Sequence, residues 1–272
     1  MTAPKTVVIT ALVCLAAHPA TASAKLPPER LRSLFDQANQ AFREANAMTD
    51  DPEQAARLYE NAILNYEKII NDGQIQNPGL YYNLANAYFL NDDIARAILN
   101  YRRAEKLDSS DTNIQKNLAF ARSKTIDRFE IKTQRRVLHT LFFWHYDFAI
   151  KTRFFLACLF FAITCAALTA TIWLGRKAPA TAAAVIGALL TVCFLLSVAI
   201  EVRHESRTVC GVITAPQIVA RQGDGNNYPP SFKEPLHAGA EFDLLERRPG
   251  WLRIRLPDET DCWIPDNAAQ LI

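Results

Sequence analysis

Two apolar runs decide the architecture of this chain: FFLACLFFAITCAALTATIWL at residues 154–174 and ATAAAVIGALLTVCFLLSVAI at residues 180–200. Neither run contains a charged residue. A helix rises about 1.5 Å per residue, so each run of about 21 residues would span roughly 31 Å, the apolar thickness of a bilayer. Only residues 175–179 separate the runs. We therefore expect a hairpin of two membrane-spanning helices, with both flanks of the chain on the same side.

Small residues recur at every fourth position in both runs, which predicts close helix packing in lipid. They are Ala162, Ala166 and Ala170 in the first run, and Ala180, Ala184 and Ala188 in the second. Neither run contains the ionisable side chain that usually marks a transport path. The sequence therefore favours an anchor, with a transport path as the alternative.

The first 24 residues have the pattern of a secretory signal peptide. Lys5 precedes an apolar stretch at residues 7–17, and Ala22-Ser23-Ala24 supplies a small-x-small cleavage site. We expect cleavage after Ala24, which places residues 25–153 and the chain after residue 200 outside the cytoplasm. The alternatives are an uncleaved anchor, and a lipoprotein on Cys14, which lacks the small residue expected just before it.

Apolar residues at helical spacing run through residues 30–130. Residues 78–111 form a 34-residue unit that resembles a tetratricopeptide repeat. The matching packing positions are Tyr81, Leu84, Ala85, Tyr88, Ala97, Tyr101 and Ala104. A degenerate copy precedes this unit at residues 34–69, and residues 114–119 begin a capping helix. We expect residues 30–130 to form an all-α tetratricopeptide-repeat solenoid.

The first helices of such repeats line a concave surface. The residues expected there are Tyr82, Asn83, Asn86, Phe89, Lys116 and Asn117. Asn86 and Asn117 stand where peptide-binding tetratricopeptide domains place asparagines, although Tyr82 replaces the usual lysine. Two interpretations remain open: the asparagines line a groove that binds an extended peptide, or they are merely solvated or take part in the stacking of the helices.

Residues 131–153 combine basic and aromatic side chains just before the first apolar run. This composition predicts an interfacial linker lying in the headgroup layer, with an ordinary connector as the alternative. His139 and His145 have no third ligand nearby, so we expect no metal site here.

The chain after Arg207 changes to the alternating pattern of strands, at residues 241–246, 251–256 and 262–265. Residues 208–272 resemble a bacterial SH3-like domain, a small all-β barrel. Its aromatic residues Tyr228, Trp251 and Trp263 could form a groove for peptide or cell-wall ligands, or could cap the core. Cys210 and Cys262 are either bridged by a disulfide or remain two buried free thiols.

The composition excludes several classes of function. With 30 basic and 28 acidic residues the net charge is +2, so the charge does not indicate nucleic-acid binding. We find no phosphate-binding loop, metal-spaced Cys/His cluster or nucleophile elbow. We therefore expect neither an enzyme nor a bound cofactor.

The order of these parts resembles the E-type Bat proteins of bacterial aerotolerance operons, over nearly all of the mature chain. The resemblance implies a membrane-anchored scaffold that works with von Willebrand A-domain membrane proteins and a MoxR-type ATPase in envelope stress or complex assembly. We expect a two-pass protein of the bacterial inner membrane whose soluble domains face the periplasm and bind partner proteins. The alternative is a cell-wall sensor whose SH3-like domain binds peptidoglycan peptides.

Overall fold

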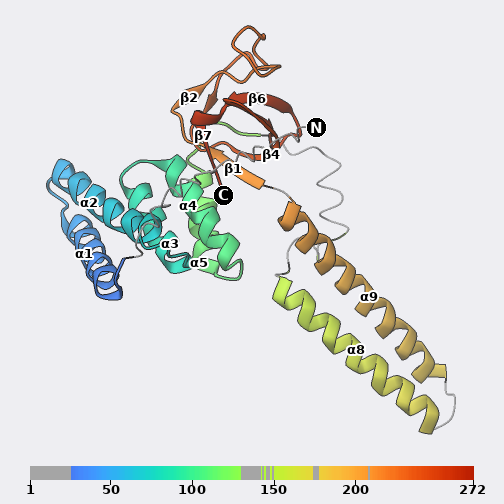
Figure 1. Cartoon of the computed structure of the whole chain (residues 1–272). Coiled ribbons are helices and arrows are strands. Elements are labelled where there is room, and N and C mark those ends of the chain that lie inside the picture. Colours follow the sequence, from blue (N-terminus) through green and yellow to red (C-terminus); the bar gives the residue numbers. More distant parts are fainter. Residues whose placement is uncertain are drawn as a thin grey trace, which may run out of the picture.

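The computed structural model describes residues 26–129, 142, 144, 148, 150–173, 178–207 and 209–272. The predicted signal peptide lies outside these residues, as do most of the predicted interfacial linker and the turn of the hairpin. Figure 1 shows a group of helices, a small sheet that lies against it, and a long helical hairpin. The protein is therefore built from helices and one antiparallel sheet.

Five helices form the N-terminal part of the chain. They are α1 (Pro28–Ala47), α2 (Pro52–Asn71), α3 (Pro78–Leu90), α4 (Ile94–Leu107) and α5 (Thr112–Arg122). Four of them begin behind an Asp or Asn whose side chain accepts a backbone N–H of the first turn, namely Asp51, Asn77, Asp93 and Asp111. Such caps satisfy N–H groups that have no partner within the helix, so the helix starts are set locally.

Consecutive helices pack in pairs, α1 with α2 and α3 with α4. Each pair contains the same kind of hydrogen bond, from a tyrosine of its second helix to an asparagine of its first. The hydroxyl of Tyr66 in α2 donates to Asn39 Oδ1 in α1 over 2.6 Å. In the second pair, the hydroxyl of Tyr101 in α4 donates to Asn86 Oδ1 in α3 over 2.5 Å. Buried alanines let the helices of each pair approach closely; they are Ala38, Ala62, Ala85 and Ala97. The two helix pairs are thus built alike.

The C-terminal sheet has five antiparallel strands in the order β6-β5-β4-β1-β7. The strands are β1 (Val209–Ile213), β4 (Glu241–Arg248), β5 (Trp251–Arg255), β6 (Asp261–Pro265) and β7 (Ala269–Leu271). Two further strands, β2 (Gln217–Ile218) and β3 (Leu236–His237), form a separate ribbon. Alternate residues of β5 and β6 are buried in one apolar core, including Leu252, Ile254, Cys262 and Ile264.

The sheet corrects one prediction, because it is not a closed barrel. The two edge strands are β6 and β7, and within the described residues no ladder joins them. The short 3-10 helix η1 (Asp266–Ala268) turns the chain away from β6, and the three-residue β7 then pairs only with β1. At the other edge, Arg221 forms an isolated bridge with Trp263. The sheet therefore remains open.

The remaining helices, α8 (Ile150–Trp173) and α9 (Ala178–Arg207), pack side by side as the predicted hairpin (Figure 1). Both are long and apolar enough to cross a membrane. Helix α9 continues to Arg207, past the predicted end of the second apolar run. The larger apolar side chains face outward: Phe155 is 66 % exposed and Leu189 is 61 % exposed. This arrangement suits a hairpin surrounded by lipid.

The contact between α8 and α9 differs from the predicted small-residue stripe. Ala162, Ala166 and Ala188 are exposed, while Ala157 and Ala184 are buried between the helices. The rings of Phe160 and Phe194 stack with centroids 5.9 Å apart. Gly187 provides the close approach, since a Cβ there would lie 2.5 Å from Thr164 Oγ1. The stacked phenylalanines together with the small residues Ala157, Ala184 and Gly187, rather than alanine spacing alone, set which face of each helix meets the other.

Candidate functional site

The structure brings together three of the six residues predicted to line a partner-binding groove. Asn117 Nδ2 in α5 donates to the hydroxyl of Tyr82 over 3.0 Å and to Asn86 Oδ1 over 3.0 Å, both in α3. We call the area formed by Tyr82, Asn83, Asn86, Phe89, Lys116, Asn117, Phe120 and Lys124 the α3–α5 surface. The asparagines predicted at two separate repeat positions are therefore direct neighbours.

The same contacts define which polar atoms of the α3–α5 surface are already used. Tyr101 donates to Asn86 Oδ1, and burial raises the pKa of Tyr101, so this phenol stays protonated as a donor. Within the described residues, Asn86 Nδ2 and Asn117 Oδ1 have no hydrogen-bond partner. The amide donor of Asn86 and the amide acceptor of Asn117 therefore remain on these half-buried side chains, and an extended peptide backbone can satisfy both.

An aromatic patch lies next to the two asparagines. The rings of Phe89 and Phe120 lie with centroids 5.4 Å apart, and Phe120 is 53 % exposed. Lys124 Nζ lies 5.1 Å from the centroid of the Phe120 ring. Phe120 and Lys124 were not among the predicted groove residues, although Phe120 follows Asn117 by three residues, one helical turn, and Lys124 lies just past the end of α5. Their addition gives the surface an apolar and a basic component.

Two of the predicted groove residues have a peripheral position. Lys116 is exposed and Asn83 is half-buried on the same pair of helices. Neither takes part in the hydrogen bonds that join Asn86, Asn117 and Tyr82. They therefore belong to the rim of the α3–α5 surface.

The aromatic residues predicted to form a second groove on the sheet are arranged differently. Trp251 and Trp263 share a face of the sheet, because Trp263 pairs with Arg253, two residues after Trp251. Trp263 is only 8 % exposed, and the guanidinium carbon of Arg248 lies 4.8 Å from its ring centroid. Tyr228, in the preceding loop, is 43 % exposed. The structure thus covers Trp263 with an arginine and leaves Tyr228 accessible.

Arg248 is itself held over Trp263 by two carboxylates. Its Nη1 lies 2.8 Å from Asp224 Oδ2, and its Nε lies 2.7 Å from Glu246 Oε1. The hydrogen bonds that Arg248 donates to Asp224 and Glu246 raise the pKa of Arg248, whose charge is therefore constant. A cation over an aromatic face is attractive, so this group stabilises the outer layer of the sheet core.

Cys210 and Cys262 are free thiols, so of the two alternatives that the sequence left open, the disulfide is not the one formed. Cys210 lies on β1 and Cys262 on β6, with β4 and β5 between them. Three strand spacings amount to about 14 Å, beyond the reach of about 7 Å between the Cα atoms of a disulfide. Burial raises the pKa of the Cys262 thiol to about 12, and burial also raises the pKa of Cys210. Both thiols are therefore protonated and poorly reactive near neutral pH.

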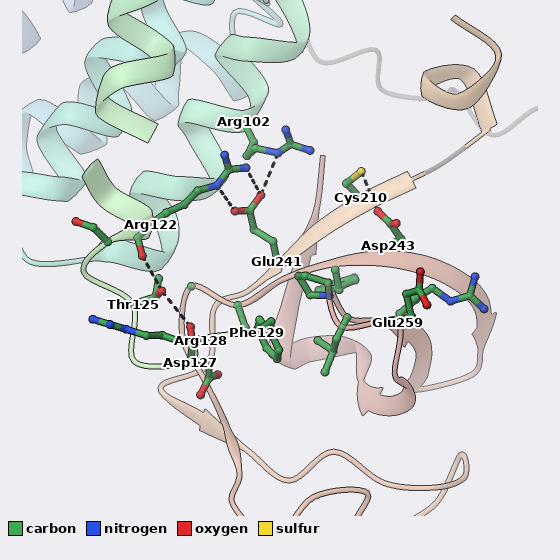
Figure 2. A pocket seen from close by; sticks show the side chains of 17 residues that line it. Arg102, Arg122, Thr125, Asp127, Arg128, Phe129, Cys210, Glu241, Asp243 and Glu259 are labelled. Atoms are coloured by element: carbon green, nitrogen blue, oxygen red, sulfur yellow. Dashed lines mark hydrogen bonds and ion pairs between the residues drawn. The ribbon is translucent and has the colours of Figure 1, made fainter. Parts of the chain in front are cut away.

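A cleft of about 1320 Å³ lies between the helices and the sheet (Figure 2). Its walls come from the C-terminal turns of α4 and α5, the segment after α5, and strands β1, β4 and β5. In Figure 2, Arg102 and Arg122 converge on Glu241 at one end of the cleft. The sequence did not predict this site, because its two walls, within residues 102–129 and 210–259, are more than 80 residues apart along the chain.

These sites offer no cluster of metal ligands among the described residues, and no matching protein indicates what they do. Within the part of the chain that the structure describes, no group of three or more His, Cys, Asp or Glu side chains is placed to hold a metal ion. Comparison of the chain with protein-family models, curated proteins and solved structures returned no match. The function must therefore be inferred from the geometry of the sites themselves.

Proposed function

We propose that this protein is a membrane-anchored adaptor that binds an extended segment of a partner protein on the α3–α5 surface. The observation that carries the proposal is the pairing of Asn86 with Asn117, which leaves one amide donor and one amide acceptor without a partner among the described residues. Side-chain amides of this kind can read a peptide backbone without regard to its side chains. The helical hairpin α8–α9 supplies the anchor.

The chemistry of the surface narrows the kind of segment that it would bind. The exposed ring of Phe120 offers a place for an apolar side chain, and Lys116 and Lys124 add positive charge on either side of it. An extended segment with one apolar anchor and an acidic residue or a carboxylate end fits this combination. Aromatic anchors and their neighbours commonly dominate the binding energy of such contacts.

Three features support the reading of the helices as tetratricopeptide repeats and of the protein as a relative of the E-type Bat proteins. The two helix pairs share the Asn–Tyr contact, α5 stands where a capping helix is expected, and the hairpin and the sheet follow in the predicted order. The alternating burial along β5 supports an SH3-like tail. On this reading the soluble parts lie in the periplasm, and the partners are von Willebrand A-domain membrane proteins and a MoxR-type ATPase system.

The cell-wall sensor has weaker support, since Arg248 occupies the face of Trp263 that a ligand would need. Of that proposed site, Tyr228 is 43 % exposed and Trp251 is half-buried. We therefore place partner binding on the helices and not on the sheet.

The test is recovery of partner proteins with the full-length chain purified from native membranes. Phe120→Ala combined with Lys116→Glu should lower recovery about tenfold, the usual scale for losing a binding hot spot. Both side chains are exposed, so the fold should tolerate the change. Leu64→Ala is the matched control, because Leu64 is 57 % exposed on α2 and lies outside the α3–α5 surface. Equal recovery by the variant and the control would contradict the proposal.

A further inference from the structure

Helix α5 carries Lys116, Asn117 and Phe120 of the α3–α5 surface and is the shortest of the five N-terminal helices. It has 11 residues, and its buried side chains Ile114, Leu118 and Ala121 pack toward α4 and α3. Residues 123–129, which follow α5, are not helical. An isolated helix of this length is marginal in water, so its position depends on its tertiary contacts.

The sheet provides such a contact at the last turn of α5. Arg122 Nε donates to Glu241 Oε1 over 2.5 Å, and Arg122 Nη2 donates to Glu241 Oε2 over 2.8 Å (Figure 2). Arg102 of α4 approaches the same carboxylate, with Nε 3.2 Å from Oε2. Paired hydrogen bonds between a guanidinium and a carboxylate set distance and orientation together. Glu241, the first residue of β4, therefore joins the ends of α4 and α5.

Separate contacts hold the sheet against α4. Val212 of β1 belongs to the buried core of the helices. Arg103 Nη2 donates to the Leu271 carbonyl over 3.3 Å, and Lys106 Nζ donates to the Ile272 carbonyl over 3.0 Å. The sheet is therefore fixed to α4 independently of Glu241, which leaves Glu241 as the contact that reaches the end of α5.

The segment after α5 also lies on the sheet. Asp127 accepts a hydrogen bond from the backbone N–H of His237 over 2.6 Å. Gly239 has a φ of +93°, and a Cβ at this position would lie 2.8 Å from Thr125 Cγ2. The close approach that Gly239 allows brings β4 and Glu241 next to the end of α5.

We propose that Glu241 is a positioning residue that sets the place of α5, and with it Asn117 and Phe120, against α3. The sheet would thus act as the C-terminal cap of the helices. The effect of this positioning on partner binding rests on the proposed function, while the positioning of α5 by Glu241 does not. Strand β1 begins at Val209, just after α9 ends at Arg207, and β1 pairs with β4, the strand that Glu241 begins. Glu241 therefore also connects the hairpin to the α3–α5 surface.

Hydrogen exchange of the full-length protein in lipid nanodiscs, read by mass spectrometry, tests the positioning without any partner. Glu241→Gln should speed exchange of the α5 amides about tenfold, the scale of losing a charge-assisted hydrogen bond, while α1 and α2 keep their rates. Glu246→Gln is the matched control on the same strand, since Glu246 pairs with Arg248 instead. Unchanged exchange in α5, or equal acceleration in all helices, would overturn the proposal.

A charge exchange separates positioning from a general loss of stability. In an Arg102→Gln background, which removes the second cation from residue 241, Arg122→Glu should accelerate exchange in α5, and adding Glu241→Arg should restore most of the protection by rebuilding the pair in reverse. If the variant with the reversed pair exchanges as fast as the one without it, the pair does not position α5. Partner recovery with Glu241→Gln is a separate readout, so failure of the adaptor function would leave the exchange result standing.

Discussion

Arg153 of α8 donates a hydrogen bond from Nη1 to Ser197 Oγ of α9 over 2.9 Å, across the hairpin. Its Nη2 also lies 3.4 Å from Glu201 Oε2. The Arg153 side chain is only 3 % exposed, whereas a charged residue at the end of a membrane span usually points toward water. The hairpin is therefore held at this end by a buried polar contact as well as by apolar packing.

Replacing Arg153 by Ala should destabilise the pairing of α8 and α9 by about 1–3 kcal/mol, because Ser197 and Glu201 both lose their contact with the buried guanidinium. The measurement is resistance of the hairpin to thermal unfolding and proteolysis in detergent. Lys151→Ala serves as the control, since Lys151 lies in the same turn and is 79 % exposed. Similar losses of stability in the two variants would show that the buried Arg153 contact does not stabilise the hairpin more than an exposed residue does.

The cysteines give a chemical test of the strand order. Alkylation of the denatured, unreduced full-length chain should label both Cys210 and Cys262, because β4 and β5 keep them apart. In the folded protein, Cys262 should react far more slowly than Cys210, since Cys262 is buried and Cys210 is half-buried. Peptide mapping by mass spectrometry reads both results. A crosslinked peptide containing the two cysteines would be incompatible with this sheet.

Buried tyrosines should make the helices sensitive to alkali. Burial raises the pKa of Tyr66 to about 12, above its value of about 10 in an unfolded chain. Between these two values the unfolded state releases a proton that the folded state keeps, so stability is full below about pH 10 and falls as the pH rises. The pH dependence of the thermal midpoint, followed by circular dichroism from pH 8 to 11, should show this loss.

Tyr66→Phe should flatten that alkaline loss, although the variant starts about 1 kcal/mol less stable because the bond to Asn39 is gone. Asn39→Ala is the companion variant: it removes the same hydrogen bond but keeps the titrating phenol, so its alkaline slope should stay steep. Identical slopes for the two variants would remove Tyr66 as a source of the pH dependence.

If α8 and α9 both cross the membrane, as their length and composition allow, the hairpin puts its two flanks on the same side. Reporter fusions after residue 130 and after Ile272 should therefore report the same compartment, which the signal-like N-terminus predicts to be the periplasm. A fusion within residues 176–178 should report the cytoplasm. A cytoplasmic result from both flanks would keep the hairpin but reverse its orientation, and different results for the flanks would exclude the hairpin.

The sequence by itself determined the local elements. Helices appear where apolar residues recur at helical spacing, and strands appear over residues 241–246 and 251–256 where apolar residues alternate. The two uncharged runs at residues 154–174 and 180–200 became the long helices α8 and α9. Asn86 and Asn117 were also placed on neighbouring helices by the repeat pattern. These features follow from spacing within a few turns or one strand, which a single stretch of sequence contains.

Only the tertiary structure decided how distant surfaces meet. Strand order separated Cys210 from Cys262, an arginine covered Trp263, and Phe160 and Gly187 set which helix faces join in the hairpin. The pair of Arg122 and Glu241 joins residues 119 positions apart. Side-chain spacing specifies which face of an element is buried, but not what covers that face. That choice depends on how well whole surfaces fit together, and many distant residues contribute to it at once.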